Sequence, residues 1–293
     1  MSFLNLGSLN IDRVLRVGRI VRPGETIAST SLAEFAGGKG ANQSVALARA
    51  GVQVAHLGKV GPDGRWLLDK LAAEGIDVQH VSVAARPTGQ AMIQVDDAGQ
   101  NAIVLDGGAN QDITEEEVDA AIDSAAAGSW LLTQNETSAV AHAIERARQR
   151  GLLVAFNPAP FDDRVRQYPL EAVDLLCLNE TEGAAMTGES EAEAIGAALH
   201  QEFPRCEIVL TLGSTGVLRH GPDGIVRCGA PRVDAVDTTA AGDSFIGYYL
   251  AGRFAGVGCR ENLEFACRAA ALCVTRAGAM DSIPRREEVR GWV

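Results

Sequence analysis

A short segment near the C-terminus carries the residue types that phosphoryl transfer needs. It reads Asp237-Thr-Thr-Ala-Ala-Gly-Asp243 and leads into an apolar stretch, Phe245 to Leu250, that we predict to be helical. Small residues at 240–242 leave backbone N–H groups uncovered at the helix start, where these groups and the helix dipole stabilise an anion. Asp243 would repel a phosphate, but it suits a base that takes a hydroxyl proton during attack on a γ-phosphate. Alone, the segment also fits an ordinary helix with an acid in its first turn.

The segment Gly7-Ser-Leu-Asn-Ile-Asp12 could hold hydroxyl groups of an acceptor. It ends the first predicted strand, and ligands of open α/β sheets bind outside the carboxyl ends of the strands. Asn10 and Asp12 alternate on one side of an extended chain, and an amide beside a carboxylate suits two neighbouring hydroxyls. An Asx turn is the simpler interpretation of this segment alone.

A glycine-rich segment, Gly37-Gly-Lys-Gly-Ala-Asn-Gln43, opens an amphipathic helix that extends to Arg49. Its glycines allow a ligand to approach the backbone closely, and Lys39 and Asn42 can supply hydrogen bonds. The spacing matches neither a Walker A loop nor the dinucleotide fingerprint G-x-G-x-x-G. A plain strand-to-helix turn explains the glycines equally well.

Two further segments follow predicted strands and could hold a nucleotide. In Asn179-Glu-Thr-Glu182, Asn179 and Glu182 could act on Mg²⁺ and phosphate oxygens through water. In Thr211-Leu-Gly-Ser-Thr-Gly216, the turn at 213–216 leaves room for a nucleotide. Each pattern is weak by itself.

Short apolar runs alternate with amphipathic stretches along the chain, which predicts a parallel sheet covered by helices. Helices are predicted over 114–127, with a capping box at Thr114 to Glu117, and over 138–150; a second capping box is predicted at Ser190 to Glu193. The predicted buried strands are Phe3–Leu6, Val54–Leu57, Trp130–Leu132, Leu152–Phe156, Leu175–Leu178 and Ile208–Leu212.

Two segments break this alternation. Residues 13–36 have no helical period, and residues 88–106 form a predicted β-hairpin with its turn at 96–100. Neither fits a βαβ unit, so together they are expected to form a small sheet that stands off the main body. The prediction is therefore one α/β domain over 1–293, three-layered and doubly wound with a mostly parallel sheet, into which this small sheet is inserted.

Composition limits the classes of function. The chain of 293 residues is 46% hydrophobic and 22% charged, and its formal charge of −12 argues against nucleic acid as a partner. Its six cysteines form no C-x-x-C pair and lie in apolar segments, as expected for reduced thiols in the cytoplasm. The first residues do not resemble a signal peptide, and no apolar run approaches the roughly 20 residues of a membrane span.

Taken together, the chain resembles the ribokinase-like carbohydrate kinase family over nearly its whole length. Its motifs occur in family order: Gly7–Asp12, Gly37–Gln43, Asn157-Pro-Ala-Pro160, Asn179–Glu182, Thr211–Gly216, Asp237–Asp243 and Val274-Thr-Arg-Ala-Gly-Ala279. The family consensus has Gly before Ala-Gly-Asp, where this chain has Ala240; ribokinases often carry Ala-Ala-Gly-Asp, which favours that branch.

The resemblance implies a reaction, ATP plus D-ribose giving D-ribose 5-phosphate and ADP, and roles for the site residues. Asp243 would be the base, and the backbone amides of Ala241, Gly242 and Asp243 would form the anion hole. The sugar contacts would be Asn10, Asp12, Gly38, Lys39, Asn42, Glu136 and Asp243. The nucleotide contacts would be Asn179, Glu182, Thr211, Gly213, Ser214, Thr215, Gly216, Gly242 and Cys267, with Mg²⁺ near Glu182.

The resemblance also implies an activating monovalent cation, usually potassium, beside the anion hole. Most of its ligands would be backbone carbonyls, and the matching positions are Asp237, Thr239, Cys273, Arg276, Gly278 and Ser282. The small sheet would be a lid that closes over the sugar and pairs with a second subunit, giving a homodimer. Because lid residues such as Arg13 differ freely from those of ribokinases, the lid and dimer contacts are the least constrained part of the resemblance.

Other acceptors fit the same chemistry. A 2-deoxyribose would leave one polar group of the Asn10–Asp12 pair without a partner. A nucleoside kinase needs apolar or aromatic base contacts in the lid, where Phe35 is the sole aromatic residue. A sugar or nucleotide sensor without activity is a third reading, although a sensor has no need of Asp243.

Overall fold

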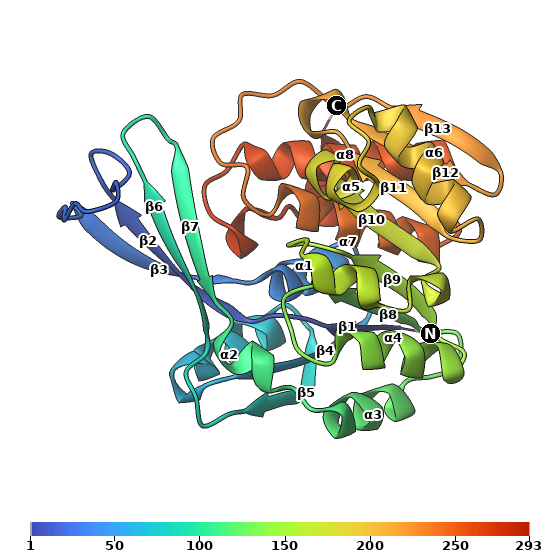
Figure 1. The fold of residues 1–293 in the computed structure, drawn as a ribbon, viewed down its shortest axis with the longest axis horizontal. Coiled ribbons are helices and arrows are strands. Elements are labelled where there is room, and N and C mark those ends of the chain that lie inside the picture. Colours follow the sequence, from blue (N-terminus) through green and yellow to red (C-terminus); the bar gives the residue numbers. More distant parts are fainter. Residues whose placement is uncertain (1, 293) are drawn as a thin grey trace.

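The computed structural model describes residues 2–292, which form two sheets and the helices around them (Figure 1). The large sheet has the strand order β13-β12-β11-β10-β9-β8-β1-β4-β5. Neighbouring strands from β11 to β5 run parallel, whereas β12 and β13 are antiparallel. The bounds are β1 Phe3–Leu6, β4 Val54–Val60, β5 Asp77–Val83, β8 Trp130–Gln134, β9 Leu153–Asn157, β10 Leu175–Asn179, β11 Glu207–Thr211, β12 Val217–Gly221 and β13 Gly224–Cys228.

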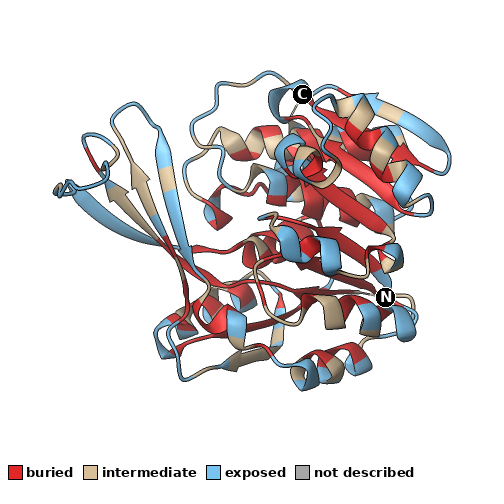
Figure 2. Cartoon of the chain, in the orientation of Figure 1, coloured by how far each residue is buried: buried red, intermediate tan, exposed pale blue. Residues whose placement is uncertain are grey.

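Helices cover both faces of this sheet, because the central strands are apolar on both faces. In β1, Phe3 packs into one core with α1, α2, α7, α8 and α9, and Leu4 packs into the other with α3, α4 and α6. Figure 2 shows these strands as the buried centre of the molecule. The bounds are α1 Lys39–Arg49, α2 Arg65–Ala73, α3 Glu115–Ser124, α4 Val140–Gln149, α5 Glu180–Thr187, α6 Ala192–Glu202, α7 Ala241–Phe254, α8 Cys259–Val274 and α9 Arg286–Gly291.

The small sheet has the order β3-β2-β6-β7 and projects from the main body (Figure 1). Its strands are β2 Asn10–Arg16, β3 Ser31–Gly37, β6 Gly89–Val95 and β7 Asn101–Asp106. β2 pairs antiparallel with β3 and parallel with β6, and β6 and β7 form the predicted hairpin. Much of this sheet is exposed (Figure 2).

The predicted fold class is confirmed, as are all six predicted strands of the large sheet: Phe3–Leu6 matches at both ends, and the others agree within three residues. The capping box at Thr114 is present, with its hydroxyl accepting from the amide of Glu117. The one predicted at Ser190 is wrong: α6 begins one residue later, with Glu191 as its N-cap and no side-chain cap. Within residues 2–292, no helix combines the length and the apolar character needed to cross a bilayer.

Candidate active site

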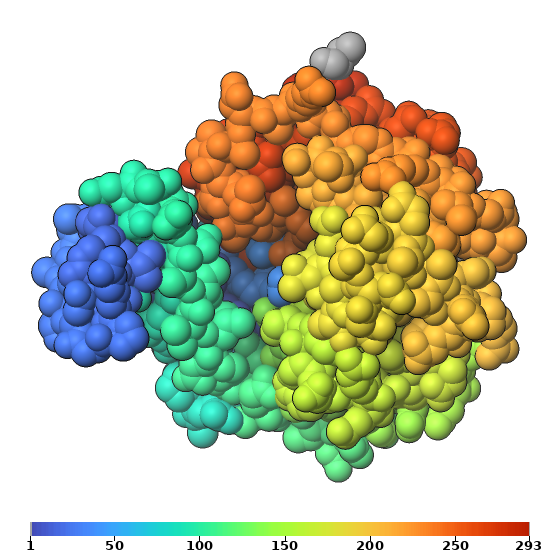
Figure 3. Space-filling model, turned by 45° about the horizontal axis from the view of Figure 1, so that its top comes forward, coloured from blue at the N-terminus to red at the C-terminus, as the bar shows by residue number. Residues whose placement is uncertain are grey.

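The carboxyl ends of five parallel strands bring the sequence motifs to one edge of the large sheet. Segments that follow β1, β8, β9, β10 and β11 carry polar side chains there, as expected for an open α/β sheet. The small sheet faces this edge, and Figure 3 shows the hollow between the two. Asn10 and Asp12, predicted at the end of the first strand, are in fact the first residues of β2 in the small sheet.

A cavity of about 540 Å³ occupies this position. The small sheet forms one wall of this cavity, through residues such as Ala91, Ile93 and Leu105. The residues predicted from the sequence that line it are Asn10, Asp12, Gly38, Lys39, Asn42, Glu136, Asn179, Glu182, Thr211, Thr239, Ala241, Gly242 and Asp243. The structure therefore brings together side chains that lie as far as 233 residues apart in the sequence, Asn10 and Asp243.

Asp243 lies in the first turn of α7 and is only 7% exposed. Its two carboxylate oxygens accept hydrogen bonds from different donors, Oδ2 from Asn42 Nδ2 at 3.0 Å and Oδ1 from Gln43 Nε2 at 2.9 Å. Both donors come from α1, so one helix orients the carboxylate carried by another. Each oxygen keeps acceptor capacity for a substrate hydroxyl.

The backbone at the start of α7 forms an anion-binding site. Ala240, the N-cap, has φ of 61°, a left-handed conformation that is uncommon for a residue with a Cβ. Of the three amides predicted for the anion hole, that of Ala241 already donates to the carbonyl of Thr238 at 3.3 Å. The amides of Gly242 and Asp243 have no acceptor among residues 2–292, as is usual in the first turn of a helix. A Cβ built at Gly242 meets no atom within 4 Å, so the space before these amides is open to a ligand.

Four acidic side chains from residues 2–292 line this cavity: Asp12, Glu136, Glu182 and Asp243. Burial, with help from Glu136 and Asp243, raises the pKa of Asp12 to about 7. Burial also raises the pKa values of Glu136 and Glu182. For Lys39, burial acts to lower the pKa, but the carboxylates of Asp243, Glu136 and Glu182 outweigh it and the net shift is upward. Lys39 is thus a charged ammonium group, and among the described residues that line the cavity it is the one cation.

Neighbouring groups hold the acceptor-side residues in place. Glu136 accepts hydrogen bonds from Ser8 Oγ and from the amide of Lys39, the latter at 3.1 Å. Asn10 Oδ1 accepts from Asn110 Nδ2 at 2.8 Å. The Asp12 carboxylate packs on the backbone of the neighbouring strand at Gly37, where a Cβ would lie 2.0 Å from Asp12 Oδ2.

A second cavity, of about 510 Å³, lies on the other side of the α7 start. Its walls are mostly apolar, with Val233, Phe245 and Val274 among them. Thr215 does not line it, because its hydroxyl donates to the carbonyl of Leu212 at 2.7 Å. The residues predicted for a nucleotide that line it are Thr211, Gly213, Ser214, Gly216, Gly242 and Cys267. Thr211, Thr238, Ala241 and Gly242 line both cavities, so the two meet at the anion-binding amides.

Most positions predicted for a monovalent cation are linked by contacts. Asp237 accepts from Thr239 and, at 3.0 Å, from the amide of Gly278. The Cys273 thiol contacts the Thr239 carbonyl at 3.8 Å and Ser282 Oγ at 3.1 Å. Burial raises the pKa of Cys273 to about 11, which leaves it a neutral thiol. The oxygen donors of Asp237, Thr239 and Ser282 fit a hard cation.

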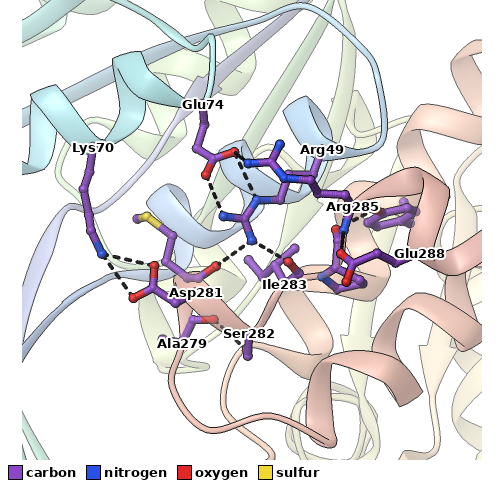
Figure 4. A network of polar contacts seen from close by, with 12 residues as sticks. Arg49, Lys70, Glu74, Ala279, Asp281, Ser282, Ile283, Arg285 and Glu288 are labelled. Carbon is purple, nitrogen blue, oxygen red and sulfur yellow. Dashed lines mark hydrogen bonds and ion pairs between the residues drawn. The ribbon is translucent and has the colours of Figure 1, made fainter.

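Arg276 differs from the other cation positions, since its side chain pairs with Glu288 at 2.6 Å and only its backbone is free to contribute. The loop that carries Ser282 is held by Arg49, at the end of α1 (Figure 4). Arg49 donates to the carbonyls of Met280 and Ile283 and forms a two-point ion pair with Glu74 at 2.6 and 3.1 Å.

Some residues of the site carried no assigned role in the sequence. Gln43 is part of a recognised motif, yet its contact with Asp243 depends on how α1 packs against α7. Asn110 belongs to no motif and reaches the site through the turn after β7. Among residues 2–292, no three His, Cys, Asp or Glu side chains gather closely enough to hold a metal ion by themselves. A divalent ion here would therefore need oxygen ligands from the substrate and water as well.

Comparison with known proteins gives a consistent result. Residues 3–286 match the pfkB family of carbohydrate kinases. A ribokinase of Haemophilus influenzae is 37% identical, over 97% of this chain and 95% of its own length. The crystal structure of a ribokinase from Cryptococcus neoformans in complex with ADP superposes with a TM-score of 0.86 at 33% identity, covering 100% of this chain and 99% of the other. An Arabidopsis thaliana ribokinase complexed with ribose and ATP superposes with a TM-score of 0.84 at 29% identity, over 99% and 97%.

Proposed function

Because the chain belongs to the pfkB family of carbohydrate kinases, we propose that it transfers the γ-phosphoryl group of ATP to the 5-hydroxyl of D-ribose. The products are D-ribose 5-phosphate and ADP. One observation carries the proposal: a polar cavity and a largely apolar cavity meet at the free amides of the α7 start, beside Asp243. This is the arrangement that in-line transfer between a hydroxylated acceptor and a nucleotide requires.

In this mechanism Asp243 takes the proton of the 5-hydroxyl while that oxygen attacks the γ-phosphorus. The new bond is between O5 and phosphorus, and the bond that breaks joins phosphorus to the β,γ-bridging oxygen of ATP. The amides of Gly242 and Asp243 stabilise the charge on the transferring group, and Lys39 lowers the cost of bringing phosphate into an acidic cavity. The protein supplies mainly position and electrostatics.

The sugar occupies the first cavity, on the side of the small sheet. Asn10 and Asp12 hold two neighbouring hydroxyls, and Lys39, Asn42 and Glu136 supply further polar contacts. Gly38 has φ of 96°, which only glycine adopts readily, and brings the backbone close to the ligand. No aromatic ring from residues 2–292 lines this cavity, which favours a sugar over a nucleoside.

ATP occupies the second cavity, with its base against the apolar wall that includes Cys267 and with its phosphates toward Gly242. A Mg²⁺ ion held with the phosphates would supply positive charge that neutralises them. Glu182 and Asn179, which line the first cavity, would offer oxygen groups to such an ion, directly or through water, and their mutual capping box holds both in place. A potassium ion is supported by the oxygen donors of Asp237, Thr239 and Ser282 and by the backbone around Gly278.

The test is an assay of ADP release with ribose, 2-deoxyribose and a panel of nucleosides, each with Na⁺ or K⁺. Release with ribose and stimulation by K⁺ are expected. Preference for a nucleoside would overturn the acceptor assignment, and equal rates in Na⁺ and K⁺ would overturn the potassium site alone. No release with any acceptor would indicate a sugar- or nucleotide-binding protein without kinase activity.

Asp243→Asn separates binding from chemistry. The variant keeps the side-chain volume and the hydrogen bond from Gln43, so it is expected to fold and to bind ribose normally by calorimetry. Loss of the base should lower kcat by about 10²- to 10⁴-fold. Full activity in this variant would exclude Asp243 as the base.

A further inference from the structure

Gln43 is a completely buried amide, 0% exposed, in contact with the carboxylate of Asp243. Both hydrogens of its Nε2 are used: one bonds to Asp243 Oδ1 at 2.9 Å and the other to Asn157 Oδ1 at 3.2 Å. Because no water reaches a fully buried side chain, a donor removed here would not be replaced. Asn42 bonds the other oxygen of the same Asp243 carboxylate.

The orientation of the Gln43 amide is determined by a second buried amide. Gln43 Oε1 accepts from Gln134 Nε2 at 2.8 Å, so rotating the amide by half a turn would set two donors against each other and an oxygen against the Asp243 carboxylate. The other hydrogen of Gln134 Nε2 bonds to Asn5 Oδ1 at 3.0 Å. Gln134 is the last residue of β8 and Asn5 belongs to β1, so rigid strands of the central sheet support the amide.

The far end of this row of polar groups is anchored to the backbone. Asn5 Nδ2 donates to the carbonyl of Gly40 and to Ser44 Oγ, both at 2.8 Å. Ser44 Oγ contacts His56 Nδ1 at 2.8 Å, and His56 Nε2 lies 3.2 Å from the carbonyl of Gly7. Burial lowers the pKa of His56 to about 4, so the ring is neutral; its Nε2 donates to Gly7, and its Nδ1 accepts from Ser44. Gln134 Nε2 therefore donates in both directions along this row, through Asn5 toward the carbonyl of Gly7 and through Gln43 toward the carboxylate of Asp243, and each contact pairs a donor with an acceptor.

We propose that Gln43 is a positioning residue for phosphoryl transfer: it holds the Asp243 carboxylate in the orientation that receives the proton of the attacking hydroxyl. Asn42 donates a hydrogen bond to one oxygen and Gln43 to the other, which restrains rotation of the carboxylate about its Cβ–Cγ bond. A catalytic group held by a supporting hydrogen bond stays within the narrow geometry that reaction requires. The inference rests on the proposed function, in which Asp243 is the base.

The experiment compares Gln43→Met with a matched control, Asn262→Leu. Asn262 is also a buried amide, 1% exposed, but it donates to the carbonyl of Tyr249 in α7 and has no hydrogen bond to Asp243. Both variants lose buried hydrogen bonds, so both should melt at lower temperature. Gln43→Met is expected to lower kcat by about 10- to 100-fold with the Kd for ribose within threefold, whereas Asn262→Leu keeps kcat within twofold.

A double-mutant cycle with Asp243→Asn distinguishes positioning from general damage. Once the base is gone, its orientation no longer matters, so Gln43→Met should add less than threefold to the loss in the Asp243→Asn background. An additive loss of 10-fold or more, or an unchanged kcat in Gln43→Met alone, overturns the positioning role. If Asp243→Asn itself is fully active, the proposed base is wrong, and that outcome is read directly from the single variant.

Discussion

At the residue scale, the left-handed backbone of Ala240 links the sequence of the motif to its function. Ala240 has φ of 61° and directly precedes Ala241 and Gly242, which line both cavities, and the amides of Gly242 and Asp243 have no acceptor among residues 2–292. For a residue with a Cβ, this conformation costs about 1–2 kcal/mol. Local strain of this kind persists only where the surrounding structure imposes it, and here it accompanies the anion-binding site.

Ala240→Gly should relieve this strain. Glycine adopts positive φ freely but loses more entropy on folding, so the net gain in the free energy of unfolding is expected to be about 0–1 kcal/mol, with kcat within threefold. Urea denaturation measures the free energy of unfolding, and the ADP-release assay measures kcat. Ala139→Gly is the control, because Ala139 has φ of 59° at the start of α4 and lies outside both cavities. If Ala240→Gly lowered the free energy of unfolding by more than 1 kcal/mol and Ala139→Gly did not, this account would be contradicted.

The raised pKa of Asp12 predicts a pH dependence. Since the folded state binds this proton up to about pH 7 and the unfolded state only up to about pH 4, the free energy of unfolding should fall as pH rises across that window. Asp12→Asn removes the ionisable group, so without sugar it should gain stability over the parent protein at pH 8 and little at pH 4, while binding ribose more weakly at pH 8.

Denaturant unfolding at both pH values checks the Asp12 prediction. Asp69→Asn, on the exposed side of α2, serves as the control for a general charge effect. Equal stability changes for Asp12→Asn at pH 4 and pH 8 would show that the carboxyl of Asp12 does not titrate in this window.

At the scale of elements, α1 connects both parts of the reaction centre. Its first residues line the sugar cavity, its second turn holds Asp243, and its last turn holds the loop at 279–283 through Arg49 (Figure 4). A rigid helix of 11 residues therefore sets the distance between the base and the proposed cation loop.

Arg49→Met should loosen that loop. The Arg49–Glu74 pair is largely buried, and removing Arg49 leaves Glu74 with the exposed Arg285 as its remaining charged partner among residues 2–292. We therefore expect the free energy of unfolding to fall by about 3 kcal/mol and the K⁺ concentration for half-maximal activity to rise. Arg285→Met is the control, because Arg285 contacts the same Glu74 at 3.3 Å from a side chain that is 65% exposed. Arg285→Met should lower the free energy of unfolding by less than about 1 kcal/mol. Equal effects of the two variants on stability and on K⁺ dependence would refute the anchoring role of Arg49.

At the scale of the whole molecule, the small sheet exposes several large apolar side chains to solvent. By the strand register, Leu32, Met92 and Val104 share the face opposite the cavity, and Leu32 and Val104 are 57% and 68% exposed. Exposed apolar patches of this kind mark association surfaces. We propose that this sheet pairs with the small sheet of a second copy to give a homodimer.

Replacing both Leu32 and Val104 with Glu should convert the dimer to a monomer in sedimentation or light-scattering measurements. Ile225→Glu is the matched control, because Ile225 is 65% exposed on β13, at the edge of the large sheet, and should leave the mass unchanged. A parent protein that is already monomeric at micromolar concentration would rule out this surface as a stable interface.

The sequence by itself determined the layered α/β fold, the family and most of the cavity-lining residues. Central strands such as Leu175–Leu178 are apolar throughout, and the glycine and Asp motifs follow strands in order, so local pattern suffices to predict them. The small sheet was also predictable as an interruption of that pattern, although the start of β2 at Asn10 was not.

Only the tertiary structure decided how the motifs meet. The bonds from Asn42 and Gln43 to Asp243 span about 200 residues, and they depend on the packing of α1 against α7 rather than on any local signal. The raised pKa of Asp12 likewise comes from burial and from two acids distant in the sequence. Local pattern encodes which residues can do chemistry, but their mutual geometry, shared burial and coupled charges exist only once the chain has folded.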